Sequence, residues 1–279
     1  MYNTCSIVIF YKGDEKKIYL LAQILSKISH VKIFDNSQTL NSEIFDNIEN
    51  VEIINLEINL GTAKAYNYAT SNYKSFKYFW LWDQDTIITE NICKNFYTRS
   101  ISLFNANNKL AATTFHDKKN YISPINNKNI LIKASTTLVS IERLRFLKSK
   151  LFENELFMDY ADWFFAQKIY KSGLEIIQIP FQDYKHKFGE TENTFFGYYS
   201  RSSEIRLYMQ ALNSIYIFKR IGLLNFLSIL LLCRIFLIPF KNLIFKDSFK
   251  RTKFFFKGLF DGLDGLNSED FMRKISKTN

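Results

Sequence analysis

The chain has 279 residues, of which 47% are hydrophobic and 17% aromatic, so its length and composition fit one large globular domain or one domain with an appendage. The formal net charge of +10 at pH 7 favours polyanionic partners, namely nucleic acid, an anionic membrane or phosphorylated substrates. Three widely separated cysteines, Cys5, Cys93 and Cys233, exclude a disulfide framework and a zinc-binding spacing and favour a reducing cytoplasm.

Short apolar runs alternate with amphipathic helical patterns in the first half of the chain. This alternation predicts βαβ units and a parallel sheet. Gly13 stands alone after the first run, so the glycines of a dinucleotide fingerprint are missing. We expect strands at Ser6–Phe10, Val31–Asp35, Val51–Asn55, Tyr78–Trp82 and Leu110–Phe115, and helices at about Lys16–Ile28, Thr62–Asn72 and Asn91–Asn107.

The next part of the chain combines a polar segment with further apolar runs. The expected elements are a loop at Lys118–Asn129, strands at Ile130–Ile141 and Glu175–Ile179, and a helix at Asp162–Ser172 that ends before Gly173. The N-terminus begins directly with a strand-like segment, so we expect no signal peptide.

The character of the sequence changes near residue 200, which predicts a domain at 1–200 and a basic helical extension at 201–279. Ile221–Phe240 is almost wholly apolar, but Asn225, Arg234 and Pro239 count against a simple membrane span. The following residues mix Lys and Arg with Phe and Leu, as in helices that lie in an anionic interface. We therefore expect peripheral attachment to the cytoplasmic face of the inner membrane. A true span, and helices that cover the first domain or form a homodimer, remain open.

Asp83-Gln84-Asp85 follows the apolar run Phe79–Trp82 and is the most informative motif. Two carboxylates two residues apart face the same side if the backbone is still extended. The carboxyl edge of an α/β sheet is where ligands usually bind. Paired carboxylates at this edge suit a divalent cation whose coordination shell is completed by the phosphates of a ligand. The alternative is a turn in which Asp83 or Asp85 caps the next helix.

Two further motifs suit nucleotide binding. Asp35 ends the second expected strand and can accept hydrogen bonds from a ribose or base, although Asp-Asn-Ser also favours a turn by itself. Gly61 permits close approach at the start of a helix, where phosphates bind, and Lys64 adds positive charge. Asn59 and Asn67 flank these two residues. The alternative is an ordinary helix entry with a glycine for clearance.

Three later residues complete the candidate set. Asp159 and Asp162 stand at a helix start, where a carboxylate can be a cap or a general base. His186 follows the last expected strand and can complete a metal shell, or be a surface imidazole among lysines.

The order and spacing of these motifs resemble family 2 glycosyltransferases of the GT-A fold, and in particular bacterial rhamnosyltransferases of polysaccharide assembly. The resemblance covers about residues 4–200 and implies a Rossmann-like mixed sheet flanked by helices. It is carried by Asp35-Asn36-Ser37, Asn59…Gly61…Asn67, Asp83-Gln84-Asp85, Asp159…Asp162…Gly173 and His186…Gly189.

The resemblance implies a role for each matching residue. Asp162 would be the catalytic base, and Asp159 would orient the acceptor. The nucleotide sugar would be bound by Asp35, Asn59, Gly61, Lys64, Asn67 and Asp83, and Mg²⁺ or Mn²⁺ by Asp85, Asp83 and His186.

The resemblance also implies the reaction. An inverting transferase would move a rhamnose-like sugar from a nucleoside-diphosphate donor to a hydroxyl of a growing polysaccharide or a lipid-linked oligosaccharide. UDP-galactofuranose or another UDP-hexose remains open as donor. The alternative of another class is a basic module that binds membrane or nucleic acid without catalysis. No RNA- or DNA-binding motif is present, so we expect no nucleic-acid partner.

Overall fold

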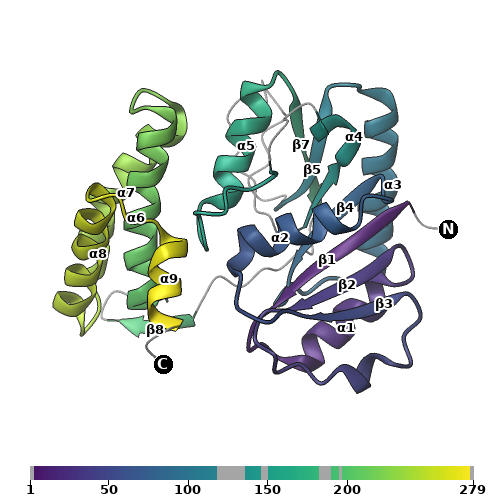
Figure 1. The fold of residues 1–279 in the computed structure, drawn as a ribbon, viewed down its shortest axis with the longest axis horizontal. Helices are drawn as coiled ribbons and strands as arrows, with labels where there is room; N and C mark the ends of the chain where they lie inside the picture. Colours follow the sequence, from purple (N-terminus) through teal and green to yellow (C-terminus); the bar gives the residue numbers. More distant parts are fainter. Residues whose placement is uncertain (1–2, 118–135, 146–149, 182–189, 195–196, 277–279) are drawn as a thin grey trace. The chain divides into compact units, whose positions relative to one another are not determined.

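The structure is a computed structural model that describes residues 3–117, 136–145, 150–181, 190–194 and 197–276. The chain folds into two compact units (Figure 1). The first unit comprises Met1–Phe152 and Phe165–Lys187, and the second comprises Glu153–Phe164 and Phe188–Asn279. The segment Glu153–Phe164, which contains Asp159 and Asp162, therefore groups with the C-terminal helices rather than with the residues that precede it.

The first unit is built on a seven-stranded mixed sheet with strand order β3-β2-β1-β4-β6-β5-β7 (Figure 1). Neighbouring strands are parallel from β3 to β4 and from β5 to β7, and β6 runs antiparallel to both of its neighbours. The strands are β1 (Thr4–Phe10), β2 (His30–Asp35), β3 (Val51–Asn55), β4 (Tyr78–Asp83), β5 (Leu110–Asp117), β6 (Thr137–Ser140) and β7 (Glu175–Phe181).

Helices of the first unit connect these strands and cover the sheet. They are α1 (Glu15–Leu25), the 3₁₀ helix η1 (Ser42–Phe45), α2 (Gly61–Asn72), α3 (Glu90–Ala106), α4 (Ile141–Leu144) and α5 (Ala161–Lys171), the last of which begins in the second unit. Alternate residues of β4 face opposite sides, as in any strand. Trp80 and Trp82 pack in one cluster with Ile18 of α1 and Phe96 of α3. This buried cluster supports the strand ends described below.

The βαβ pattern expected from the sequence is confirmed, with helix ends that differ from the expected ones by at most three residues. The expected strand Ile130–Ile141 was wrong at its end, because β6 stops at Ser140 and Ile141 begins α4. Its first part, Ile130–Ser135, and the expected loop Lys118–Asn129 lie outside the described residues. The short antiparallel pair β8 (Glu190–Thr194) and β9 (Gly197–Arg201) was not expected.

The second unit contains helices α6 (Glu204–Ile221), α7 (Phe226–Asn242), α8 (Ser248–Leu263) and α9 (Ser268–Ser276). Helix α6 packs against the other three, and Gly258 of α8 approaches it so closely that a Cβ there would lie 2.2 Å from the carbonyl oxygen of Tyr208. Gly222, at a φ of +77°, ends α6. Among the described residues, no helix combines the length and the apolar character that a membrane crossing requires.

Candidate active site

Strands β1, β2 and β4 end side by side at one edge of the sheet. In the strand register, Asp35 at the end of β2 lies opposite Phe10, and Asp83 at the end of β4 lies opposite Ile9. The backbones of Asp35 and Asp83 therefore flank the end of β1, about two strand spacings or 10 Å apart along the sheet. This is the edge at which open α/β sheets bind ligands.

The Asp83-Gln84-Asp85 motif begins in the strand and continues as a turn. Strand β4 ends at Asp83, and the backbone N–H of Thr86 donates to the carbonyl oxygen of Asp83 at 3.3 Å. The expectation that an extended backbone places both carboxylates on one side therefore does not apply. The helix-cap alternative is also wrong, because Thr89 caps α3 by accepting from the N–H of Ile92 at 3.4 Å. Both carboxylates of the motif are partly exposed.

Gln84 joins this turn to the loop after β1. Its side-chain oxygen accepts from the N–H of Tyr11 at 2.7 Å, and its side-chain nitrogen donates to the carbonyl oxygen of Tyr11 at 3.1 Å. Gly13 leaves room for this arrangement, because a Cβ there would lie 2.6 Å from the Gln84 amide. Sequence reasoning noticed the lone Gly13 but missed its partner 71 positions later, since only the β1–β4 pairing brings the two residues together.

Asp35 is fully buried, and both of its carboxylate oxygens accept hydrogen bonds from the loop that follows β2. One oxygen accepts from the N–H and hydroxyl of Ser37, both at 2.7 Å, and from the N–H of Gln38 at 3.0 Å. The other oxygen accepts from the N–H of Leu40 at 2.8 Å. Burial acts to raise the pKa of Asp35, but these hydrogen bonds outweigh it and lower the pKa below its ordinary value. The turn alternative accounts for these contacts, and contact with a nucleotide stays a prediction.

The start of α2 is held by two asparagines. The side-chain oxygen of Asn36 accepts from the N–H of Leu60 at 2.9 Å, and its amide nitrogen donates to the carbonyl oxygen of Gly61 at 3.2 Å. Asn59 accepts from the N–H of Gly61 at 2.9 Å. Gly61 has a φ of +68°, a left-handed conformation that favours glycine. The loop between β3 and α2 is thus tied to the end of β2.

Asn67 and Lys64 occupy different environments on α2. Asn67 is buried, and its amide pairs with both backbone groups of Phe152, donating to the carbonyl oxygen at 2.8 Å and accepting from the N–H at 3.0 Å. Lys64 lies partly exposed in the first turn of the helix. The structure therefore explains Asn67 by its support of the Phe152 segment, and its contact with a sugar nucleotide stays a prediction.

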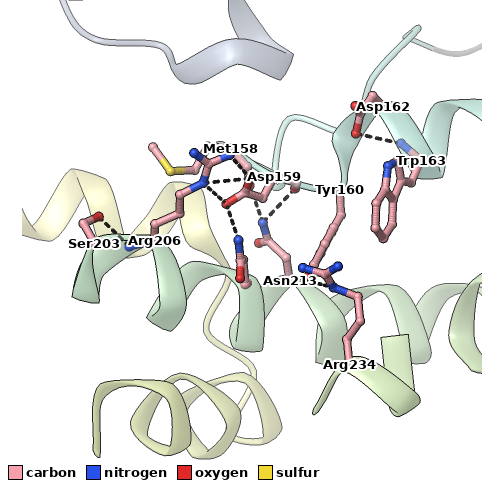
Figure 2. Close-up of polar contacts among 10 residues, drawn as sticks. Met158, Asp159, Tyr160, Asp162, Trp163, Ser203, Arg206, Asn213 and Arg234 are labelled. Atoms are coloured by element: carbon pink, nitrogen blue, oxygen red, sulfur yellow. Dashed lines mark hydrogen bonds and ion pairs between the residues drawn. The ribbon is translucent and has the colours of Figure 1, made fainter. Parts of the chain in front are cut away.

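Asp159, in the second unit, is bound by helix α6 (Figure 2). The Nε atom of Arg206 lies 2.9 and 3.1 Å from its two carboxylate oxygens, and an Nη atom of Arg206 lies 2.6 Å from one of them. Gln210 donates a further bond at 3.2 Å. The Asp159 side chain is only 11% exposed. A charge-assisted, two-nitrogen contact of this kind fixes geometry as well as adding energy.

The backbone at Asp159 is strained. Asp159 and Tyr160 have φ angles of +57° and +63°, which non-glycine residues adopt rarely and at a cost of about 1–3 kcal/mol each. Asn213 donates to the carbonyl oxygens of Met158 and Asp159 at 2.6 and 3.1 Å, and the Tyr160 hydroxyl accepts from Nε of Arg234 at 3.1 Å (Figure 2). Burial raises the pKa of Tyr160. Such strain persists only where surrounding contacts impose it, and it is common at functional sites.

Asp162 follows this strained segment in the first turn of α5. One of its carboxylate oxygens accepts from the N–H of Trp163 at 2.9 Å (Figure 2), and the side chain is partly exposed. A negative charge is favoured at this end of a helix. The helix-cap and general-base alternatives both fit this position, and the role of Asp162 as a general base stays a prediction.

A divalent metal fits the donor set at the end of β4. Asp83 and Asp85 offer carboxylate oxygens, and the usual Mg²⁺ shell in such sites takes one or two carboxylates, substrate phosphates and water. His186 lies outside the described residues. Within the ranges that the structure describes, no group of three or more His, Cys, Asp or Glu side chains could enclose a metal without the substrate.

No protein-family model matches the chain, and no curated protein sequence matches it. The fold of the chain is similar to that of S. aureus TarS. For residues 1–349 of TarS in complex with UDP-GlcNAc the TM-score is 0.51 at 18% identity, over 78% of this chain and 67% of that chain. The same fragment in complex with UDP gives 0.51 at 19% identity over 78% and 66%, and a longer TarS structure gives 0.51 at 20% identity over 78% and 40%.

These comparisons define the class of fold. The chain spans about two thirds of the TarS fragment and less than half of the longer TarS chain. TarS is a neighbour of the GT-A type, so the expected mixed α/β fold with a seven-stranded sheet flanked by helices is confirmed. The likeness extends to the fold, and function is argued from the site.

Proposed function

We propose that the protein is a glycosyltransferase that takes its sugar from a nucleoside-diphosphate donor. The observation that carries the proposal is the position of Asp83-Gln84-Asp85. This turn lies at the edge of the sheet where ligands bind in GT-A folds. Its two carboxylates do not cap α3, because Thr89 does. Its central residue, Gln84, forms hydrogen bonds with the loop after β1. TarS, which shares the fold, was solved with UDP-GlcNAc and with UDP, and this supports a nucleotide sugar as the ligand class.

The donor would be bound by the first unit. In this proposal the loop at Asn59 and Gly61, together with Lys64, contacts the phosphates, because a helix start and a lysine both favour anions. Asp83 contacts the ribose or the metal, and Asp85 is the principal metal ligand, with His186 as a further contact. Asp35 contacts the base or ribose. A bound Mg²⁺ or Mn²⁺ would neutralise charge on the leaving diphosphate.

The chemical step would be a direct displacement at the anomeric carbon. Asp162 accepts the proton of an acceptor hydroxyl, the hydroxyl oxygen forms the new bond to carbon, and the bond from carbon to the diphosphate oxygen breaks. The configuration inverts, and the nucleoside diphosphate leaves with the electron pair. Asp159 keeps the segment before Asp162 in place through its contacts with Arg206. No protein nucleophile is needed.

The specific donor is proposed from the resemblance of the motifs. A rhamnose-like sugar on a nucleoside diphosphate is the first choice, with UDP-galactofuranose or another UDP-hexose as the alternative. The acceptor would be a hydroxyl of a growing cell-surface polysaccharide or of a lipid-linked oligosaccharide.

A thermal-shift screen tests the proposal directly. Unfolding of the protein is followed with dTDP-rhamnose, UDP-galactofuranose, UDP-GlcNAc or UDP, each with and without Mn²⁺. We expect stabilisation by at least one nucleotide sugar that is larger with Mn²⁺, and loss of the Mn²⁺-dependent part in Asp85→Asn. Asp46→Asn, at an exposed carboxylate of the same unit, is the matched control and keeps the full shift. Absence of any shift with every nucleotide would overturn the proposal.

A further inference from the structure

The outward face of α7 is apolar from Phe226 to Phe240, and the exposed Lys241 follows in the last turn of the helix. Side chains at the spacing of one helix face are exposed, whereas Leu227, Leu231 and Ile238 on the opposite face are buried. The exposed residues of this face, which we call the α7 face, are Phe226, Ile229, Leu232, Cys233, Phe236, Leu237 and Phe240. Phe236 and Phe240 are 66% and 69% exposed, and the α7 face contains no charged side chain.

The outward face of α8 carries both aromatic rings and positive charges. Phe249 is 84% exposed, and Phe256 and Phe260 follow it at helical spacing. Four exposed lysines accompany these rings: Lys250 and Lys257 form ion pairs with Glu204 and Asp261, and the other two are Lys246, just before the helix, and Lys253 within it. Apolar residues next to lysines on one exposed helix face are typical of helices that lie in a membrane interface.

These side chains are not used by the core of the second unit. The inner faces of α6, α7 and α8 meet in a separate cluster formed by Leu207, Ala211, Ile238 and Phe255. The exposed residues therefore remain available for a partner. The turn between α6 and α7 adds Leu223 and Leu224, of which Leu224 is 95% exposed. The second unit therefore exposes large apolar side chains on α7, on α8 and in the turn before α7, and such side chains mark interaction sites where they gather.

We propose that the α7 face and the aromatic residues of α8 insert into the headgroup region of an anionic lipid bilayer, with Lys246 and Lys253 against the lipid phosphates. The charge of the surface favours this occupant. A two-fold dimer would place the same patch against itself and bring lysines toward lysines, whereas an anionic bilayer offers the opposite charge to every lysine. The net charge of +10 acts in the same direction. The attachment is peripheral, in the plane of one leaflet.

Sedimentation with vesicles tests this inference without donor or acceptor, so it fails or succeeds separately from the proposed reaction. The full chain is mixed with vesicles of phosphatidylcholine alone or of phosphatidylcholine with phosphatidylglycerol. We expect binding to the anionic vesicles that weakens as salt is raised. Phe236→Ser/Phe240→Ser should weaken binding roughly tenfold or more, because each ring loses its apolar burial. Lys246→Gln/Lys253→Gln should weaken it about 25-fold, at about fivefold per lysine.

Matched double variants in the first unit control for composition and charge. Leu20→Ser/Ile58→Ser removes two side chains that are 58% and 63% exposed, and Lys16→Gln/Lys74→Gln removes two exposed positive charges. Both controls should bind like the unchanged protein. Equal loss in the controls, or no sedimentation with anionic vesicles, would overturn the inference. So would a dimer in light scattering that Phe236→Ser/Phe240→Ser converts to monomer without any vesicle binding.

Discussion

Gln84 and Tyr11 lie 73 residues apart in sequence, and the side-chain amide of one pairs with both backbone groups of the other at 2.7 and 3.1 Å. The two hydrogen bonds lie just beyond the last paired residues of β1 and β4, and they connect the residue after β1 with the residue after β4. A rigid connection therefore runs between the loop after β1 and the turn that contains Asp83 and Asp85.

Gly13→Ala should displace the Gln84 amide, because the added Cβ would lie 2.6 Å from it. The loss of two hydrogen bonds should lower the free energy of unfolding by about 1–2 kcal/mol in urea denaturation. In a Gln84→Ala background Gly13→Ala should leave the free energy of unfolding roughly unchanged, because the Gln84 amide that the added Cβ would displace is absent. Additive effects in this double-mutant cycle would contradict the contact.

Asp35→Asn should remove a pH-dependent part of stability. The pKa of Asp35 is lowered in the folded protein, so ionised Asp35 favours folding above its unfolded pKa of about 3.9. This contribution is lost as pH falls through the lower folded pKa. The gap between wild type and Asp35→Asn in unfolding free energy should thus be constant from about pH 6 to 8 and shrink below about pH 4. A gap that widens in acid would contradict the assignment.

Arg206→Ala should destabilise the second unit by about 1–2 kcal/mol, because it leaves a mostly buried carboxylate without its guanidinium. Arg206→Lys should restore only part of this, since an ammonium cannot contact both oxygens in the same geometry. Arg220→Ala on the same helix is the control. Arg220 is 58% exposed and 3.8 Å from Glu153, so its loss should change stability by less than about 0.5 kcal/mol. Urea denaturation of the four proteins measures these differences.

Asp162→Asn should lower kcat about 10²- to 10⁴-fold, the usual contribution of a general base, with little change in the affinity for the nucleotide sugar. Steady-state assays and calorimetry separate the two quantities. Glu142→Gln, at an exposed carboxylate in the first unit, should leave both unchanged. A variant that retains more than about half of the wild-type kcat would remove Asp162 from the proposed mechanism.

The sequence predicted the architecture of the first unit well, because hydrophobic periodicity reports strands and helices that pack on a core. It predicted less of the site. The sequence pattern could suggest that Asp35 or Asn67 was functional. It could not show that Asp35 accepts a hydrogen bond from the backbone of Leu40, or that Asn67 is hydrogen-bonded to the backbone of Phe152. Such contacts depend on loops that meet only in the folded chain. The left-handed pair at Asp159 and Tyr160 was equally hidden, since neither residue is a glycine.

Three amides, those of Asn36, Asn67 and Gln84, each donate to one backbone carbonyl and accept from one backbone N–H. A carboxylate of the same shape has no hydrogen to donate, so one of its oxygens would face the carbonyl oxygen without a hydrogen bond. It would also add a negative charge to the loop. Deamidation at any one of these three positions adds almost no bulk and yet removes half of the contact. The geometry of the loops around the site therefore depends on these three side chains remaining amides.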